Sequence, residues 1–119
     1  MTNEVLIEGL SMNNSKKIEL KELTNFIQKI ADMYFLAIRN NEEEMLSENT
    51  EHYNDYERFV FKVRNAFESL SREEKILINN EFFYQDYPNW WRKSYSPNRY
   101  YRMKRKSMLR FKEALDHEI

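Results

Sequence analysis

Residues 92–112 constrain the fold more than any other part of the chain. This stretch holds nine Lys or Arg and no Asp or Glu, although acidic residues make up 20 of the 119 positions. Close pairs of like charges repel one another by a few tenths of a kcal/mol, on the order of 0.2–0.5. We therefore expect the stretch to form a cationic surface, because a core cannot hold so many unpaired charges.

The remainder of the chain is acidic. Residues 1–91 carry a net charge of −7 and residues 113–119 one of −3, against +9 for residues 92–112, which gives the formal total of −1. The near-neutral total therefore hides a strong charge separation. Such a separation is typical of proteins that bind a polyanion.

A helix is predicted to begin at Pro97. Ser96 is a suitable N-cap, and proline suits the first helical position because its φ is fixed and its missing N–H would be unpaired there. Residues at intervals of three and four then form one packing side: Tyr100, Met103, Ser107, Met108, Phe111, Ala114 and Leu115. The opposite side is polar and mostly basic: Asn98, Arg99, Arg102, Arg105, Lys106 and Arg110.

A shorter helix is expected immediately upstream, over residues 88–94, beginning at Pro88. Only Tyr95 separates it from the Ser96 cap. A short helix, a tight turn and a longer basic helix form the outline of a helix-turn-helix.

Residues 95–108 resemble a known recognition helix. Their sequence, Tyr-Ser-Pro-Asn-Arg-Tyr-Tyr-Arg-Met-Lys-Arg-Lys-Ser-Met, is similar to that of the sigma-70 region 4 type of helix-turn-helix, and more specifically to that of ArpU-type phage transcriptional regulators. Residues 70–77, Leu-Ser-Arg-Glu-Glu-Lys-Ile-Leu, resemble the preceding helix of the same family. The resemblance covers roughly residues 70–115 and leaves residues 1–69 unexplained. It implies a DNA-binding transcriptional regulator of phage type.

The chain departs from the family pattern at four positions. Trp90, Trp91 and Lys93 stand where the family has a small residue and a turn glycine, and Arg99 replaces the usual threonine.

Three further helices follow from apolar spacing, near residues 18–39, 53–69 and 72–85. The third is expected to begin after Ser71, which lies three residues before Glu74 and so forms a capping box. It is expected to turn Ile76, Leu77, Asn80, Phe83 and Tyr84 inward.

The two remaining segments are expected to lie outside helices. Residues 1–15 are interpreted as a loosely ordered arm, and the Glu-rich residues 42–51 as a solvated linker that follows a helix end at Asn40-Asn41.

The predicted fold class is all-α, a small domain of about five helices with a C-terminal helix-turn-helix. Residues 1–69 form an N-terminal helical region for dimerisation or partner contact, and residues 70–119 form the nucleic-acid-binding region. The two regions are expected to make one compact unit.

Composition argues against catalysis and against membrane insertion. The chain has no Cys, two His and one Gly, so neither a Cys-based metal site nor a phosphate-binding glycine loop is expected. Adjacent carboxylates such as Glu73 and Glu74 are interpreted as a hydrated face. No apolar run approaches the roughly 20 residues that span a bilayer. We expect a cytoplasmic protein that is not an enzyme and has no cofactor or metal.

In a major groove, residues near the start of the 97–116 helix should reach base edges. The expected base contacts are Asn98, Arg99, Arg102 and Lys106. The expected phosphate contacts are Arg92, Lys93, Ser96, Lys104 and Arg105.

The expected partner is double-stranded DNA, with RNA polymerase or a second copy of the chain contacted by the N-terminal helices. An alternative is a helical interaction protein whose basic helix docks an acidic protein or RNA without reading sequence. The aromatic residues of this region, Trp90, Trp91, Tyr95, Tyr100 and Tyr101, provide a possible stacking platform for bases. Core packing of at least one Trp is the favoured interpretation.

Overall fold

A computed structural model describes residues 2–46 and 53–117, and every regular element in these ranges is helical. The elements are α1 (Thr2–Leu46), α2 (Tyr53–Glu68), α3 (Arg72–Ile78), the π-helix η1 (Asn79–Phe83) and α4 (Pro97–His117). The described residues contain no strand, which confirms the all-α fold class.

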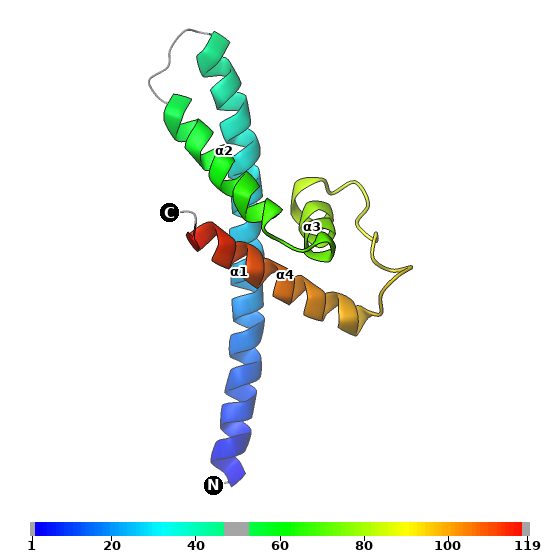
Figure 1. The fold of residues 1–119 in the computed structure, drawn as a ribbon. Coiled ribbons are helices and arrows are strands. Elements are labelled where there is room, and N and C mark those ends of the chain that lie inside the picture. The colour runs from blue at the N-terminus through cyan, green and yellow to red at the C-terminus, as the bar shows by residue number, and fades with distance from the viewer. Residues whose placement is uncertain (1, 47–52, 118–119) are drawn as a thin grey trace.

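Helix α1 is much longer than expected. It has 45 residues, and at about 1.5 Å per residue it accounts for the 67 Å long axis of the molecule (Figure 1). The arm predicted over residues 1–15 is wrong for residues 2–15, which are helical. The helix end predicted at Asn40-Asn41 and the linker predicted from residue 42 are wrong as far as Leu46, because α1 continues to that residue. The rest of that linker, residues 47–51, lies outside the described residues. No proline interrupts α1, and its single glycine costs a helix only about 1 kcal/mol.

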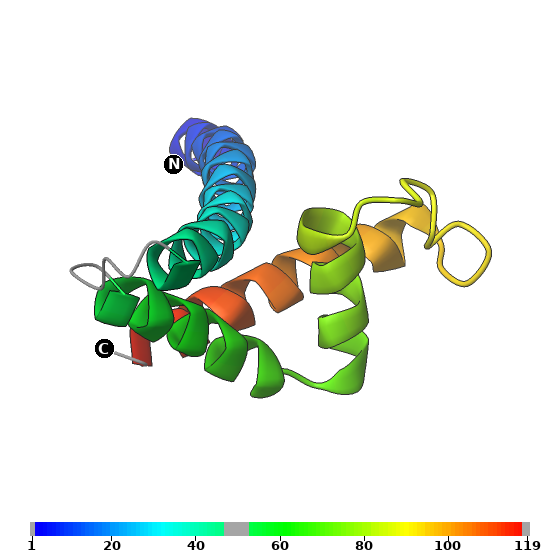
Figure 2. The same ribbon diagram turned by 90° about the horizontal axis from the view of Figure 1, so that it is seen from above.

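The core lies where the four α-helices and η1 meet. Its buried members are Ile27, Ala31, Val63, Ala66, Leu70, Leu77, Ile78, Phe82, Met108, Phe111 and Leu115. Helix α4 crosses α1, and its N-terminal end reaches away from α1 past α3 (Figures 1 and 2). The start of α4 therefore stands at the edge of the molecule.

Helix α3 begins as the capping box predicts. Ser71 Oγ accepts from the backbone N–H of Glu74 at 3.2 Å, and Glu74 Oε1 accepts from the backbone N–H of Ser71 at 2.9 Å. The predicted helix 72–85 ends at Phe83 instead, because its last turn is a π-helix in which the Tyr84 N–H donates to the carbonyl of Asn79.

The core-facing side chains of α3 and η1 differ from those predicted. Phe82 enters the core, whereas Tyr84 is 58% exposed, contrary to the expectation that it points inward. Ile76 is also exposed, at 44%, because Leu77 and Ile78 occupy the core side of α3. The extra residue in a π-turn rotates the helix relative to an α-helical pattern.

The helix predicted over residues 88–94 is absent. These residues form consecutive turns instead. The backbone N–H groups of Trp90, Arg92 and Ser94 donate hydrogen bonds to the carbonyls of Tyr87, Asn89 and Trp91, respectively. A helix of seven residues leaves most of its terminal N–H and C=O groups without partners, so tertiary contacts of the two tryptophans decide the local backbone. The described chain has four α-helices rather than five.

Helix α4 begins at Pro97 as predicted. The Arg99 N–H donates to Ser96 Oγ at 3.3 Å, and the Tyr100 N–H donates to the Ser96 carbonyl at 2.9 Å. The buried residues of α4 are Tyr100, Ser107, Met108, Phe111 and Leu115, all on the predicted packing side.

Candidate nucleic-acid interface

The solvent face of α4 presents three of the predicted base contacts together. At about 100° per residue, Asn98, Arg102 and Lys106 fall within roughly 80° of one another around the helix. All three side chains are exposed, and so is Arg99 at the edge of the same face. The predicted group of base-contacting residues is therefore one continuous surface.

Two of the predicted cations are placed by neighbouring aromatic rings. The Arg99 guanidinium carbon lies 5.1 Å from the centroid of the Tyr95 ring, and that of Arg92 lies 5.8 Å from the Trp91 ring. Both arginine side chains remain exposed. Such cation–π contacts contribute about 0.5–1 kcal/mol at exposed sites, which restrains the side chains without neutralising their charge.

Four other cations of residues 92–112 are paired with carboxylates. The nitrogen–oxygen distances are 3.6 Å for Lys104 and Glu81, 3.8 Å for Arg105 and Glu19, 3.4 Å for Arg110 and Glu74, and 3.8 Å for Lys112 and Asp116. Lys104 is the most enclosed of them, with a side chain 19% exposed. Its ammonium group faces the protein interior, so the structure gives this predicted phosphate contact an internal partner.

The five remaining cations are Arg92, Lys93, Arg99, Arg102 and Lys106, and we call them the N-terminal basic patch. None of the five forms an ion pair with a residue whose side chain the structure describes. The patch occupies the end of the 84–96 connection and the first ten residues of α4. The nine cations thus divide into four that pair with described carboxylates and five, between Arg92 and Lys106, that do not.

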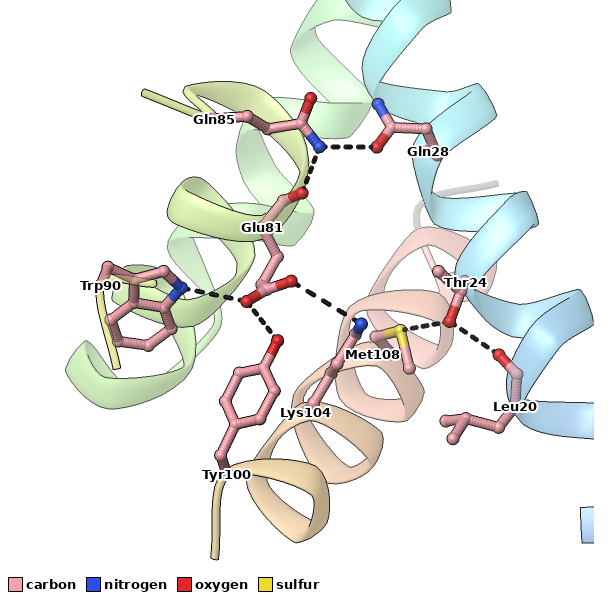
Figure 3. A network of polar contacts seen from close by, with 9 residues as sticks. All are labelled: Leu20, Thr24, Gln28, Glu81, Gln85, Trp90, Tyr100, Lys104 and Met108. Atoms are coloured by element: carbon pink, nitrogen blue, oxygen red, sulfur yellow. Dashed lines mark hydrogen bonds and ion pairs between the residues drawn. The ribbon is translucent and has the colours of Figure 1, made fainter. Parts of the chain in front are cut away.

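Glu81 of η1 is the centre of the polar network behind this patch (Figure 3). Its Oε1 accepts hydrogen bonds from Trp90 Nε1, at 3.0 Å, and from the Tyr100 hydroxyl, while its Oε2 lies 3.6 Å from Lys104 Nζ. The Glu81 side chain is only 14% exposed. Burying a carboxylate is unfavourable unless donors surround it, and these three donors come from the connection and from α4. The carboxylate therefore fixes both segments against η1.

Burial raises the pKa of the Tyr100 hydroxyl well above its ordinary value of 10, and the hydrogen bond to the Glu81 carboxylate raises it further. The hydroxyl therefore stays protonated at neutral pH and acts as a donor. An ionised Tyr100 would place a second negative charge beside Glu81.

Further contacts join the connection and α4 to α1 (Figure 3). Gln85 Nε2 donates to Gln28 Oε1 at 3.0 Å and also to the backbone carbonyl of Glu81. Near the helix crossing, Thr24 Oγ1 donates to the Leu20 carbonyl at 2.7 Å and lies 3.6 Å from Met108 Sδ. The long helix α1 thus serves as the support on which the connection and α4 are positioned.

The aromatic residues of this region pack mainly against one another. Trp91 and Tyr100 stack with ring centroids 4.1 Å apart and an interplanar angle of 9°, and Trp90 meets Tyr95 and Tyr100 edge to face. Both tryptophans are half-buried, and Trp90 packs against the core cluster, as expected for at least one of them. Of the five rings proposed as a stacking platform, Tyr101 is the exposed one, at 55%.

The residues that sequence reasoning missed are acidic. Glu74, expected in a hydrated face, is 5% exposed, and its Oε2 pairs with Arg110 Nε without the geometry of a hydrogen bond. The sequence pattern does not identify Glu81, because its hydrogen-bond and ion-pair partners lie 9 to 23 residues away in sequence. Its one available signal is that it is the only acid among the aromatic residues of 79–84.

The described residues contain no group of three or more side chains suited to hold a metal ion. No described helix combines the length and apolarity needed to cross a membrane. Comparison of the chain with protein-family models, with curated proteins and with solved structures gives no match.

Proposed function

We propose that the chain is a DNA-binding transcriptional regulator that inserts the start of α4 into a major groove. The observation that carries this proposal is the division of the cations. Carboxylates of α1, α3 and η1 pair with the cations nearer the body, whereas the N-terminal basic patch, at the edge of the molecule, pairs with no carboxylate whose side chain the structure describes. Unpaired clustered cations on an exposed helix are the electrostatic signature of nucleic-acid binding.

The dimensions of the patch suit a major groove. The first ten residues of α4 span about 15 Å, and a B-DNA major groove about 12 Å wide admits one α-helix. Asn98, Arg102 and Lys106 would face base edges, since Asn suits adenine and Arg or Lys suits guanine. Arg92 and Lys93, on the preceding turns, would contact phosphates and set the register.

The helix-turn-helix in this proposal consists of α3 with η1, residues 84–96 and α4. Its connection of 13 residues is longer than the three or four of a standard turn. The Glu81 network would take the place of the short turn by fixing the connection and α4 against η1. The resemblance of residues 70–115 to sigma-70 region 4 and ArpU-type regulators supports the same assignment, and it adds RNA polymerase as a second proposed partner.

One observation favours the alternative, a basic helix that docks an acidic protein or RNA without reading sequence. Tyr101 exposes its ring beside Arg102, and an exposed ring among cations is a feature of proteins that hold single strands without sequence preference.

Binding of the purified protein to a randomised duplex library, followed by selection and measurement at two salt concentrations, separates the two functions. The regulator predicts an enriched sequence whose advantage over random duplex persists at the higher salt. Equal affinity for all duplexes, with a steep loss on adding salt, would support the alternative.

A further inference from the structure

The first third of α1 extends beyond the body of its own chain. Helix α4 crosses α1 near Thr24, and residues 2–18 continue past the crossing for about 25 Å. In Figures 1 and 2 no other described element runs alongside this segment. Helical segments without tertiary packing are marginal in water. The projecting segment would therefore gain stability from a partner surface.

A groove lies where the projecting segment leaves the body, between α1 and α4. Its floor is apolar and is lined by Leu20, Leu23, Phe26 and Leu109. Phe26 is 38% exposed and Leu109 is 40% exposed. An open apolar groove of this kind suits the apolar side of a helix.

The charged walls of the groove restrict what can occupy it. Glu19 and Glu22 form the α1 wall, and Arg105 and Lys112 form the α4 wall. Glu19 and Arg105 pair across the groove at 3.8 Å. Glu22 and Lys112 add charges of opposite sign on the two walls, so a partner segment of one charge sign is repelled by one wall or the other. The occupant should therefore be a helix of balanced charge with apolar residues.

Residues 2–18 of this chain meet that description. Their sequence holds two Glu, two Lys and six aliphatic or Met residues. We infer that two copies of the chain form an antiparallel dimer in which the projecting segment of each α1 packs along the groove of the other.

The register of the two paired α1 helices follows from the length of the projecting segment. A two-fold axis near residue 18 places residues 2–18 of one chain alongside residues 18–34 of its partner, the region that contains the groove and the exposed Met33. The two bodies then lie on opposite sides of the axis. The paired helices overlap for about 50 Å, and a strip about 10 Å wide gives roughly 1,000 Å² of total contact. That area is near the lower bound for a specific interface, so the dimer dissociates on dilution.

Sedimentation velocity over a range of protein concentrations tests the dimer in the full chain. Phe26→Asp places a charge in the groove and should weaken dimerisation by about tenfold or more, as expected for loss of a buried anchor. The matched control is Phe61→Asp, because Phe61 is 64% exposed on α2, away from the groove. Circular dichroism shows whether each variant keeps its helices. A monomer at every concentration, or equal weakening by both substitutions, would overturn the inference.

Cross-linking tests the antiparallel arrangement. The chain has no Cys, so a single introduced cysteine reports one position. Glu19→Cys lies next to the axis and should form a disulfide-linked dimer, whereas the two copies of Met33→Cys lie about 45 Å apart and should not. Cross-linking at both positions would indicate a parallel pair and contradict the inference. Neither measurement involves nucleic acid, so the outcome is independent of the proposed function.

Discussion

The hydroxyl of Tyr100 donates a hydrogen bond to the carboxylate of Glu81, which joins the first turn of α4 to the π-helix η1. The same carboxylate oxygen accepts from Trp90, so the 84–96 connection is held at the same point. One half-buried acid therefore determines where the N-terminal basic patch lies relative to the core.

We predict that Glu81→Gln lowers the free energy of unfolding by about 2 kcal/mol, because hydrogen bonds to charged groups contribute about 1.5–3 kcal/mol and Lys104 loses its counter-ion. Urea denaturation measures the loss. Glu57→Gln, on the exposed side of α2, is the matched control and should change stability by less than about 0.5 kcal/mol. Equal stability of the two variants would show that the network does not hold the connection.

Alkaline pH should weaken the fold through Tyr100. Its pKa is raised in the folded state, so its contribution to stability is fully present below the unfolded value of 10 and is lost as the pH rises above it. We predict that Tyr100→Phe is less stable than the wild type at neutral pH and loses less stability between about pH 8 and pH 11. Urea denaturation at several pH values measures how steeply the free energy of unfolding falls with pH in the wild type and in Tyr100→Phe. Tyr101→Phe is the exposed control. Parallel slopes for the wild type and Tyr100→Phe would contradict this account.

The N-cap of α3 provides a local test of the fold. Ser71→Ala removes the hydroxyl that accepts from the Glu74 N–H, and we predict a loss of about 1 kcal/mol. Thermal unfolding checks it, with Ser94→Ala in the turns before α4 as the control. An unchanged melting temperature would mean that the cap does not stabilise α3.

Sequence reasoning located the elements whose causes are local. The Ser71 and Ser96 caps lie within three residues of their partners, so the starts of α3 and α4 were predicted correctly. The apolar side of α4 also follows from spacing alone.

The connection before α4 was predicted wrongly because its causes are not local. The side chains of Trp90 and Trp91 contact Glu81 and Tyr100, 9 residues away in each case, and these contacts replace the expected helix with turns. The burial of Glu74 likewise depends on Arg110, which no pattern around residue 74 reveals. The patch residues were identified by charge, but their separation from the paired cations required the structure.

Base reading and phosphate contact should separate at Arg102 and Arg105. Arg102 lies near the middle of the exposed face, whereas Arg105 is displaced by about 300° around the axis and pairs loosely with Glu19. We predict that Arg102→Ala costs about 1–3 kcal/mol on the selected duplex and much less on random duplex. Arg105→Ala should weaken both alike. Fluorescence anisotropy with the two duplexes measures the four affinities, and equal losses for Arg102→Ala on both would contradict base reading.

The salt dependence of duplex binding tests the central claim most directly, namely that the N-terminal basic patch binds DNA. Each phosphate contact that is removed should reduce the slope of log K against log salt by about one. We predict this reduction for Arg92→Gln and for Lys93→Gln, and an unchanged slope for Lys112→Gln, whose ammonium group pairs with Asp116. An equal reduction for all three variants, or none for the two patch variants, would contradict the account.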